Sequence, residues 1–322
     1  MMRRVLRIVA VLVALAMIAF VIFRTPDTDP AEMRAKYGGE PSQFVKLDSG
    51  LEVHLRDEGP RDAPAIILLH GSNADLHTWQ PWVDRLKADY RVIRFDQPGH
   101  GLTGATPDGD YSTATYVRAI DDLADALKLD RFILGGNSMG GYHTLEYALA
   151  HPERVQAMVL VDAGGPPVKL ESGGNIGFTL ARIPVLNQLL KHITPRSMVE
   201  KSLSQSVSNQ AVVTPEAVDR YWELLRYPGN RHATMVRFGQ DRVLLTDAQA
   251  SSLTMPALVI WGEEDRLIPL AAGVWLDTHL PNSTLVTLPG IGHLPMEEVP
   301  EPTAANLRSW LAEQEFTELE GN

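Results

Sequence analysis

The sequence predicts an α/β fold in which an eight-stranded, mostly parallel sheet is covered by helices on both faces. Short apolar runs with the length of buried strands recur along the chain, and helical patterns long enough to cross between parallel strands separate the later runs. This alternation is typical of strands joined by helical crossovers. The apolar runs are residues 44–47, 51–55, 65–69, 91–95, 132–134, 155–161, 258–261 and 284–288, and the helical patterns are residues 115–127, 140–150 and 271–280.

The composition is that of a globular protein. The chain has 322 residues, and 44% of them are hydrophobic, which is enough for a large core. Its formal net charge of −11 would repel a phosphate backbone, so we do not expect nucleic acid as a partner. The chain has no cysteine, which excludes disulfides, thiolate metal sites and cysteine nucleophiles.

The first 24 residues differ from the rest. Three arginines precede an unbroken apolar run over residues 8–23, which spans roughly 24 Å as a helix and reaches across a bilayer of about 30 Å if Arg7 snorkels. No small-residue cleavage site follows the run, so we expect residues 1–24 to be an uncleaved membrane anchor rather than a cleaved signal peptide. The arginines should stay cytoplasmic, which places the rest of the chain on the periplasmic or extracellular side. Cleavage would instead give a secreted protein.

The domain organisation follows from the positions of the strands. Residues 25–42 contain three prolines and several acidic residues, and we expect them to form a linker. Residues 164–250 show helical patterns without a clear strand, and a structureless loop of that length is improbable in a compact domain. We therefore expect a helical cap at 164–250, inserted into a core formed by residues 43–163 and 251–315, over the carboxyl edge of the sheet.

A nucleophile is predicted where the strand at 132–134 runs into the sequence GGNSMGG and then a helical pattern. A G-x-S-x-G motif in this context lifts its serine onto a sharp turn, where side chains at Gly136 or Gly140 would clash with neighbouring elements. The motif alone is weak, because glycine-rich turns are common. The strand and the helix around it favour Ser138 as a nucleophile at the helix N-terminus.

A serine nucleophile needs a base within hydrogen-bond reach, and the base needs an acid to fix its tautomer. His293 lies in a glycine-flanked loop after the last strand, and Asp265 follows the strand at 258–261. The chain order Ser138, Asp265, His293 is the one this kind of sheet enzyme uses. Asp162, at the end of another strand, is the alternative acid.

The negative charge that develops on an attacked carbonyl oxygen needs hydrogen-bond donors, each worth about 3 kcal/mol of barrier. The backbone N–H of Met139 is one candidate. The sequence HGSN at residues 70–73 offers the backbone N–H of Ser72 as the other, because Gly71 lets the chain turn back. We expect His70 to support this loop by hydrogen bonds.

The motifs HGSN, FDQPGHG, GGNSMGG, WGEEDRLIP and GIGHLP together resemble the successive signatures of the α/β-hydrolase superfamily, over residues 43–315. The resemblance is to its serine esterases and meta-cleavage-product hydrolases. It implies an antiparallel second strand, a helical cap after the sixth strand, and a Ser-Asp-His triad without metal or organic cofactor. In such proteins the loop that contains His100 is mainly structural. Serine at position 138 argues against haloalkane dehalogenases and epoxide hydrolases, which use an aspartate nucleophile.

We therefore expect a carboxylic ester hydrolase that forms an acyl-enzyme on Ser138 and takes a small apolar ester. An acyltransferase would differ only in the acceptor.

Cleavage of a C–C bond is an alternative, since the elbow resembles that of meta-cleavage-product hydrolases. That reading is weakened by Leu294, where those enzymes tend to have tryptophan, and by a less glycine-rich oxyanion loop. Arg220, beside Trp222, would bind a substrate carboxylate in that reading and is otherwise a surface residue of a cap helix. A non-catalytic, membrane-tethered binding module is the third possibility, although such relatives usually lose a triad residue.

Overall fold

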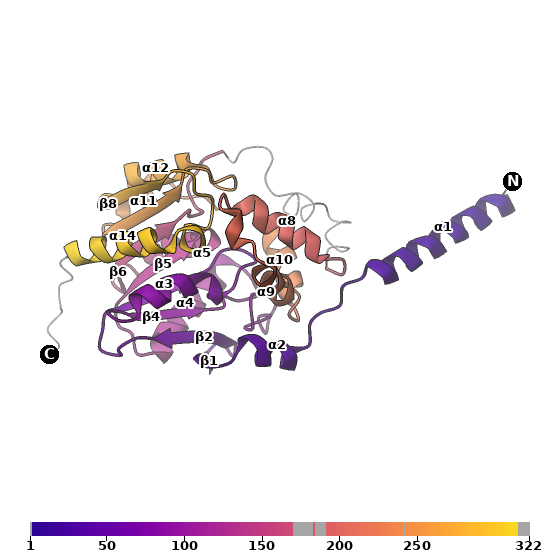
Figure 1. Cartoon of the computed structure of the whole chain (residues 1–322), viewed down its shortest axis with the longest axis horizontal. Coiled ribbons are helices and arrows are strands. Elements are labelled where there is room, and N and C mark those ends of the chain that lie inside the picture. Colours follow the sequence, from indigo (N-terminus) through magenta and orange to yellow (C-terminus); the bar gives the residue numbers. More distant parts are fainter. Residues whose placement is uncertain (1, 170–182, 184–190, 241–242, 315–322) are drawn as a thin grey trace.

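The computed structural model describes residues 2–169, 183, 191–240 and 243–314. Each of the eight predicted runs forms a strand, and the strands make one sheet in the order β1-β2-β4-β3-β5-β6-β7-β8 (Figure 1). β2 is antiparallel to both β1 and β4, and the pairs from β4 through β3, β5, β6 and β7 to β8 are parallel, as expected. The strands are β1 (Ser42–Lys46), β2 (Glu52–Glu58), β3 (Ala65–Leu69), β4 (Arg91–Phe95), β5 (Phe132–Asn137), β6 (Val155–Val161), β7 (Ala257–Gly262) and β8 (Ser283–Leu288).

Helices cover both faces of the sheet, and for that reason the central strands are continuous apolar runs. β3 is buried along its whole length and its side chains alternate between the two faces. Ile67 and Leu69 pack into a core with residues of α4, α5 and α12, whereas Ile66 and Leu68 pack with residues of α3 and α14. These helices are α3 (Gln80–Leu86), α4 (Thr113–Ala126), α5 (Met139–Ala150), α12 (Leu270–His279) and α14 (Pro300–Glu313).

Between β6 and β7, the described residues form helices and no strand, as expected for a cap. α8 (Arg196–Ser206), α9 (Pro215–Leu225) and α10 (Asn230–Gly239) gather at one side of the sheet, the side from which α1 projects (Figure 1). α9 begins at a typical N-terminal signal, because Thr214 caps it by accepting the N–H of Ala217 and Pro215 occupies its first position. Residues 170–182, 184–190 and 241–242 of the expected cap lie outside the described residues. The next described helix after α10 is α11 (Asp247–Ser252).

The apolar run at the N-terminus lies within one helix, α1 (Met2–Phe23), which projects from the body of the protein (Figure 1). It is 22 residues long, and its apolar window has a mean hydropathy of 3.0 and is 0% buried. The helix is long and apolar enough to cross a membrane, a property that signal sequences near an N-terminus share.

The segment expected to be a linker, residues 25–42, is partly folded. Asp29 caps a short helix, α2 (Pro30–Tyr37), by accepting the N–H groups of Ala31 and Glu32, and Pro30 takes its first position. Met33 of this helix is buried against Leu102 of the core and Leu224 of the cap. The folded part therefore begins before Gln43, because this helix buries an apolar side chain that a linker would expose.

Candidate active site

Ser138 stands at a sharp turn between β5 and α5. Its backbone has φ +55° and ψ −113°, a strained conformation for a residue other than glycine. A Cβ atom at Gly136 would lie 2.3 Å from the carbonyl carbon of Gly140, and one at Gly140 would lie 2.2 Å from the carbonyl oxygen of Leu69. The two glycines thus let the turn pack against β3 while the serine side chain points out of it.

Asp265 and His293, which are 28 residues apart, are joined by a hydrogen bond. His293 Nδ1 lies 2.7 Å from Asp265 Oδ2, and the two side chains are 6% and 0% exposed. The other carboxylate oxygen of Asp265 accepts the backbone N–H groups of Leu267 and Ile268, at 2.7 and 3.1 Å. An acceptor at Nδ1 puts the imidazole proton there and leaves Nε2 free to take a proton.

Asp162, the alternative acid, lies beside this pair without replacing Asp265. Its Oδ1 accepts the backbone N–H of Gly262 at 3.0 Å, and its backbone φ is +45°. Burial, together with the nearby carboxylate of Asp265, raises the pKa of Asp162 well above its ordinary value. The imidazole of His293 is bonded to Asp265 and not to Asp162, so Asp265 is the carboxylate that orients it.

By distance, Asp162, Asp265 and His293 could also hold a metal ion, because one ligand atom from each lies within 4.8 Å of the others. Their bonding favours a different use. The Nδ1 atom of His293 is bonded to Asp265, and both carboxyl groups already accept backbone N–H groups. The cluster is therefore better suited to orient an imidazole than to bind a cation.

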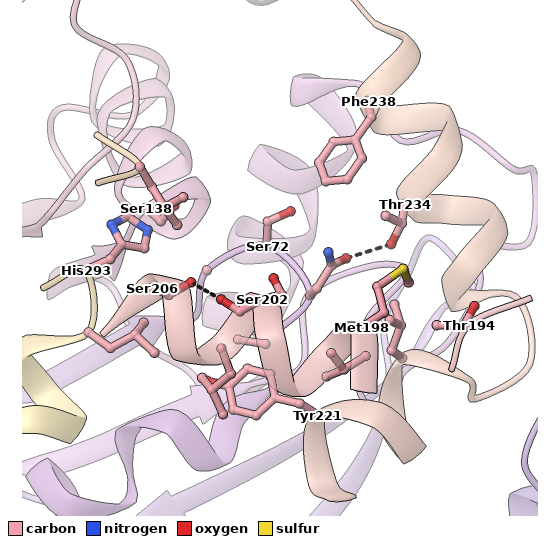
Figure 2. Close-up of a pocket in the computed structure, with 18 of the residues that line it drawn as sticks. Ser72, Ser138, Thr194, Met198, Ser202, Ser206, Tyr221, Thr234, Phe238 and His293 are labelled. Atoms are coloured by element: carbon pink, nitrogen blue, oxygen red, sulfur yellow. Dashed lines mark hydrogen bonds between the residues drawn. The ribbon is translucent and has the colours of Figure 1, made fainter. Parts of the chain in front are cut away.

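The loop after β3 lies against the serine turn. A Cβ atom at Gly71 would lie 2.8 Å from Asn137 Oδ1 and 3.3 Å from the Cβ atom of Ser138. Ser72 follows this glycine and lines the same cavity as Ser138 and His293 (Figure 2). Met139 begins α5, where the first backbone N–H groups of a helix have no partner within the helix. The geometry brings both predicted oxyanion residues next to the serine.

Buried polar side chains support the two loops. His70 Nδ1 lies 2.8 Å from the carbonyl of Gly71, and its Nε2 accepts the backbone N–H of Gln97 at 3.0 Å. Because Nε2 accepts a hydrogen bond, it carries no proton, and burial lowers the pKa of His70; both nitrogens thus serve structure, as expected. Asn137 Nδ2 donates to the carbonyls of Val161 and His293, which ties the serine turn to the histidine loop. His100, likewise buried, contacts the carbonyl of Pro98 through Nδ1.

Ser138 and His293 lie at one end of the cavity, and its walls combine apolar side chains with hydroxyl groups such as those of Ser202 and Thr234 (Figure 2). Helices of the cap supply most of the apolar side chains, and the loops after β7 and β8 supply the others. Such a pocket suits a substrate with an apolar group next to a carbonyl. The apolar lining residues are Met198, Val199, Leu203, Tyr221, Leu225, Met235, Phe238, Leu267 and Leu294.

Arg220 fits neither expectation for it. Its Nε lies 3.3 Å from Asp75 Oδ2 and its Nη2 lies 3.8 Å from Glu297 Oε2, and the Asp75 side chain is only 1% exposed. The Arg220 side chain is 20% exposed, so it is half-buried rather than fully on the surface. Since two carboxylates already hold its guanidinium, it is also a poor site for a substrate carboxylate.

A second arginine of the cap, which the sequence analysis did not single out, reaches the oxyanion residues. Arg237 Nη1 lies 2.9 Å from Ser72 Oγ and 2.7 Å from Met139 Sδ. No local motif marks this position. It can be found only once α10 is placed over the loop after β3.

Comparison with known proteins agrees with the geometry. Residues 64–300 match the family described as the alpha/beta hydrolase fold. A 2-hydroxy-6-oxononadienedioate/2-hydroxy-6-oxononatrienedioate hydrolase of Comamonas testosteroni is 28% identical over 78% of this chain and 90% of its own length. A 2-hydroxy-6-oxo-6-phenylhexa-2,4-dienoate hydrolase of Burkholderia cepacia is 29% identical, with the same coverages.

Two solved structures are similar to the whole fold. A meta-cleavage product hydrolase from Pseudomonas fluorescens superposes with a TM-score of 0.75 at 23% identity, covering 84% of this chain and 97% of that one. A bacterial membrane phospholipase A superposes with a TM-score of 0.72 at 25% identity, covering 97% of this chain and 98% of that one.

Proposed function

Since the chain belongs to the α/β-hydrolase fold family and is a hydrolase of that fold, we propose that it cleaves carboxylic esters through an acyl-enzyme on Ser138. The observation that carries this proposal is the bond between Asp265 and His293 at the end of a cavity that the strained Ser138 also lines. A nucleophile, a base and an acid thus meet at one place from three separate loops.

In the first half of the reaction, Ser138 Oγ attacks the ester carbonyl carbon while His293 Nε2 takes its proton. Asp265 holds the imidazole in the required tautomer through the 2.7 Å bond to Nδ1 and stabilises the positive charge that forms. The backbone N–H groups of Ser72 and Met139 stabilise the oxyanion, each by about 3 kcal/mol. When the intermediate collapses, His293 gives the proton to the departing alcohol.

In the second half, His293 takes a proton from a water molecule, which attacks the acyl carbon. The collapse of this intermediate returns the proton to Ser138 Oγ and releases the acid. The mainly apolar walls formed by α8, α9 and α10 would hold the acyl or the alcohol group against water.

Hydrolysis of a C–C bond is the second candidate, favoured by the names of the relatives from Comamonas testosteroni and Burkholderia cepacia. Two features of the site favour esters instead. Leu294, which stands where such hydrolases tend to have tryptophan, lines the cavity, and Arg220 is closed off by Asp75 and Glu297.

We further propose that α1 anchors the protein in a membrane, with residues after Arg24 on the non-cytoplasmic side. The chain just after α1 is bonded to the cap: the N–H of Thr25 donates to the carbonyl of His192 at 2.7 Å, and Arg231 Nη2 lies 2.6 Å from Asp27 Oδ1. Arg231 also lines the cavity. An anchored α1 would therefore hold the cavity close to the bilayer, which is compatible with the likeness to a membrane phospholipase A.

The test is turnover of p-nitrophenyl esters of increasing acyl length by the full-length chain in detergent micelles, with Ser138→Ala as the matched variant. We expect hydrolysis by the native chain and a loss of at least a thousandfold in the variant. Turnover of a 2-hydroxy-6-oxo-dienoate without ester hydrolysis would favour the C–C reaction. Neither activity, with no labelling by a fluorophosphonate, would favour a binding module.

A further inference from the structure

Among the described residues, Arg237 has no carboxylate partner. Its hydrogen-bond partners are the hydroxyl of Ser72 at 2.9 Å, the thioether of Met139 at 2.7 Å and the hydroxyl of Thr234 at 3.5 Å, all of them neutral. Its Nε is buried without a hydrogen-bond partner. In the part of the chain that the structure describes, no carboxylate oxygen lies within the 4.0 Å of an ion pair.

Three other arginines of the cap are paired with carboxylates. Arg196 lies 2.5 Å from Asp219, Arg220 lies 3.3 Å from Asp75, and Arg231 lies 2.6 Å from Asp27. A charge taken out of water is costly unless it is paired, and a guanidinium does not lose its proton at physiological pH. Arg237 is thus held at an energetic cost that the protein avoids at these three positions.

The described titratable side chains that interact with Arg237 do not supply a negative charge either. Burial, and then the positive charge of Arg237, lower the pKa of His100 and of His143 well below the ordinary value. Burial raises the pKa of Tyr116, so its hydroxyl stays neutral as well. The environment is therefore polar, neutral and closed, and it increases the attraction of the guanidinium for an incoming anion.

The guanidinium lies behind Ser72, a residue of the cavity wall, and donates to its hydroxyl. Thr234 and Phe238 of the same helix line the cavity, and so does Ser72, whose oxygen Arg237 contacts (Figure 2). Since the guanidinium donates to Ser72 Oγ, the hydroxyl hydrogen of Ser72 stays available as a donor. Two donors, one of them charged, are thereby placed beside the predicted oxyanion site.

We propose that Arg237 and the hydroxyl of Ser72 bind an anionic group of the substrate, carried close to the carbonyl that Ser138 attacks. The inference rests on the proposed function of the site. A guanidinium recognises carboxylates and phosphates by the same forked geometry, so the anion is either a carboxylate on a small ester or the phosphate of a phospholipid headgroup.

Matched pairs of neutral and anionic esters distinguish these sources. The first pair is p-nitrophenyl butyrate and mono-p-nitrophenyl succinate, and the second is dihexanoylglycerol and dihexanoyl phosphatidate. For the full-length chain in neutral detergent, we expect kcat/KM to favour the anionic member of one pair. In Arg237→Met that preference should fall at least tenfold, because kcat/KM for the anionic ester should fall much more than kcat/KM for the neutral one. Arg237→Lys, which keeps the charge but not the fork, should retain part of it.

Arg196→Met is the control, because it removes a cap arginine that is paired with Asp219, whereas Arg237 contacts Ser72 and Met139. Its preference should equal that of the native chain. A preference that persists in Arg237→Met, or equal losses for the anionic and the neutral ester, would overturn the inference. The second result would mean that Arg237 only supports the oxyanion loop.

Binding gives a readout that does not depend on turnover. Calorimetry on Ser138→Ala should show, for one of two pairs, tighter binding of the anionic member. The pairs are monomethyl succinate with the uncharged methyl butyrate, and dihexanoyl phosphatidate with dihexanoylglycerol. Adding Arg237→Met to Ser138→Ala should abolish this difference in binding. Equal binding of both members in both pairs rejects the anion site. If the native chain hydrolyses no ester while the binding preference is present, the proposed reaction fails and the anion site stands.

Discussion

His293 Nδ1 lies 2.7 Å from Asp265 Oδ2, and the Asp265 side chain is wholly removed from solvent. The partners of Asp265 Oδ1 are backbone N–H groups, so the direction of this carboxylate is fixed by the chain itself. The imidazole is therefore oriented before any substrate arrives.

Asp265→Asn should abolish most activity without unfolding the protein. The amide would favour the wrong imidazole tautomer, and we expect kcat to fall by about 10³ to 10⁴ with little change in KM. Steady-state kinetics on a p-nitrophenyl ester measure this, with circular dichroism as the control for folding. A loss of less than tenfold would show that another group orients His293.

Asp162→Asn should preserve activity, because His293 is bonded to Asp265 and asparagine keeps the shape of a side chain whose neutral form burial favours. Its pKa is raised in the folded state, so its contribution to stability is complete below the unfolded value near 3.8 and is lost as the pH rises through the folded value. Asparagine does not titrate. Thermal unfolding between pH 4 and pH 9 should therefore show a smaller decline for the variant, and an equal decline in both proteins would contradict a protonated Asp162.

Gly140→Ala should destabilise the serine turn. The new Cβ atom would lie 2.2 Å from the carbonyl oxygen of Leu69, so β3 and α5 would have to separate, at a cost of roughly 1–3 kcal/mol or more. Gly39→Ala is a matched control, since nothing lies within 4 Å of its Cβ position. Urea unfolding compares the two, and equal midpoints would show that the turn tolerates a side chain.

Arginine in the middle of α1 should release the protein from membranes. Each arginine at the centre of a spanning helix costs about 3 kcal/mol, so Leu12→Arg together with Leu15→Arg should shift the full-length chain from the membrane pellet to the soluble fraction. Lys46→Arg, outside the helix, is the control. A native chain that is itself soluble, or shortened at its N-terminus, would argue for a cleaved signal sequence.

The sheet and the serine turn could be predicted because their signals are local. Buried strands such as Val155–Val161 are apolar along their length, and the turn at Ser138 needs glycines at fixed spacing. The roles of Asp265 and His293 followed from chain order, and the structure brings the two side chains together.

What the sequence did not reveal depends on contacts between distant residues. Asp29 and Pro30 are a helix-start signal, but the partners that bury Met33, such as Leu102 and Leu224, come from other parts of the chain. No local sequence motif distinguishes Arg220 from Arg237. Only the fold pairs the first with Asp75 and leaves the second without a carboxylate among the residues that the structure describes.

The most direct test of the central proposal is to map the site of covalent modification. The full-length chain is treated with a fluorophosphonate and digested, and the adduct is located by mass spectrometry. We predict one adduct on Ser138, absent from Ser138→Ala and strongly reduced in His293→Ala. An adduct on another residue, or none on the native chain, would contradict a serine nucleophile at this turn.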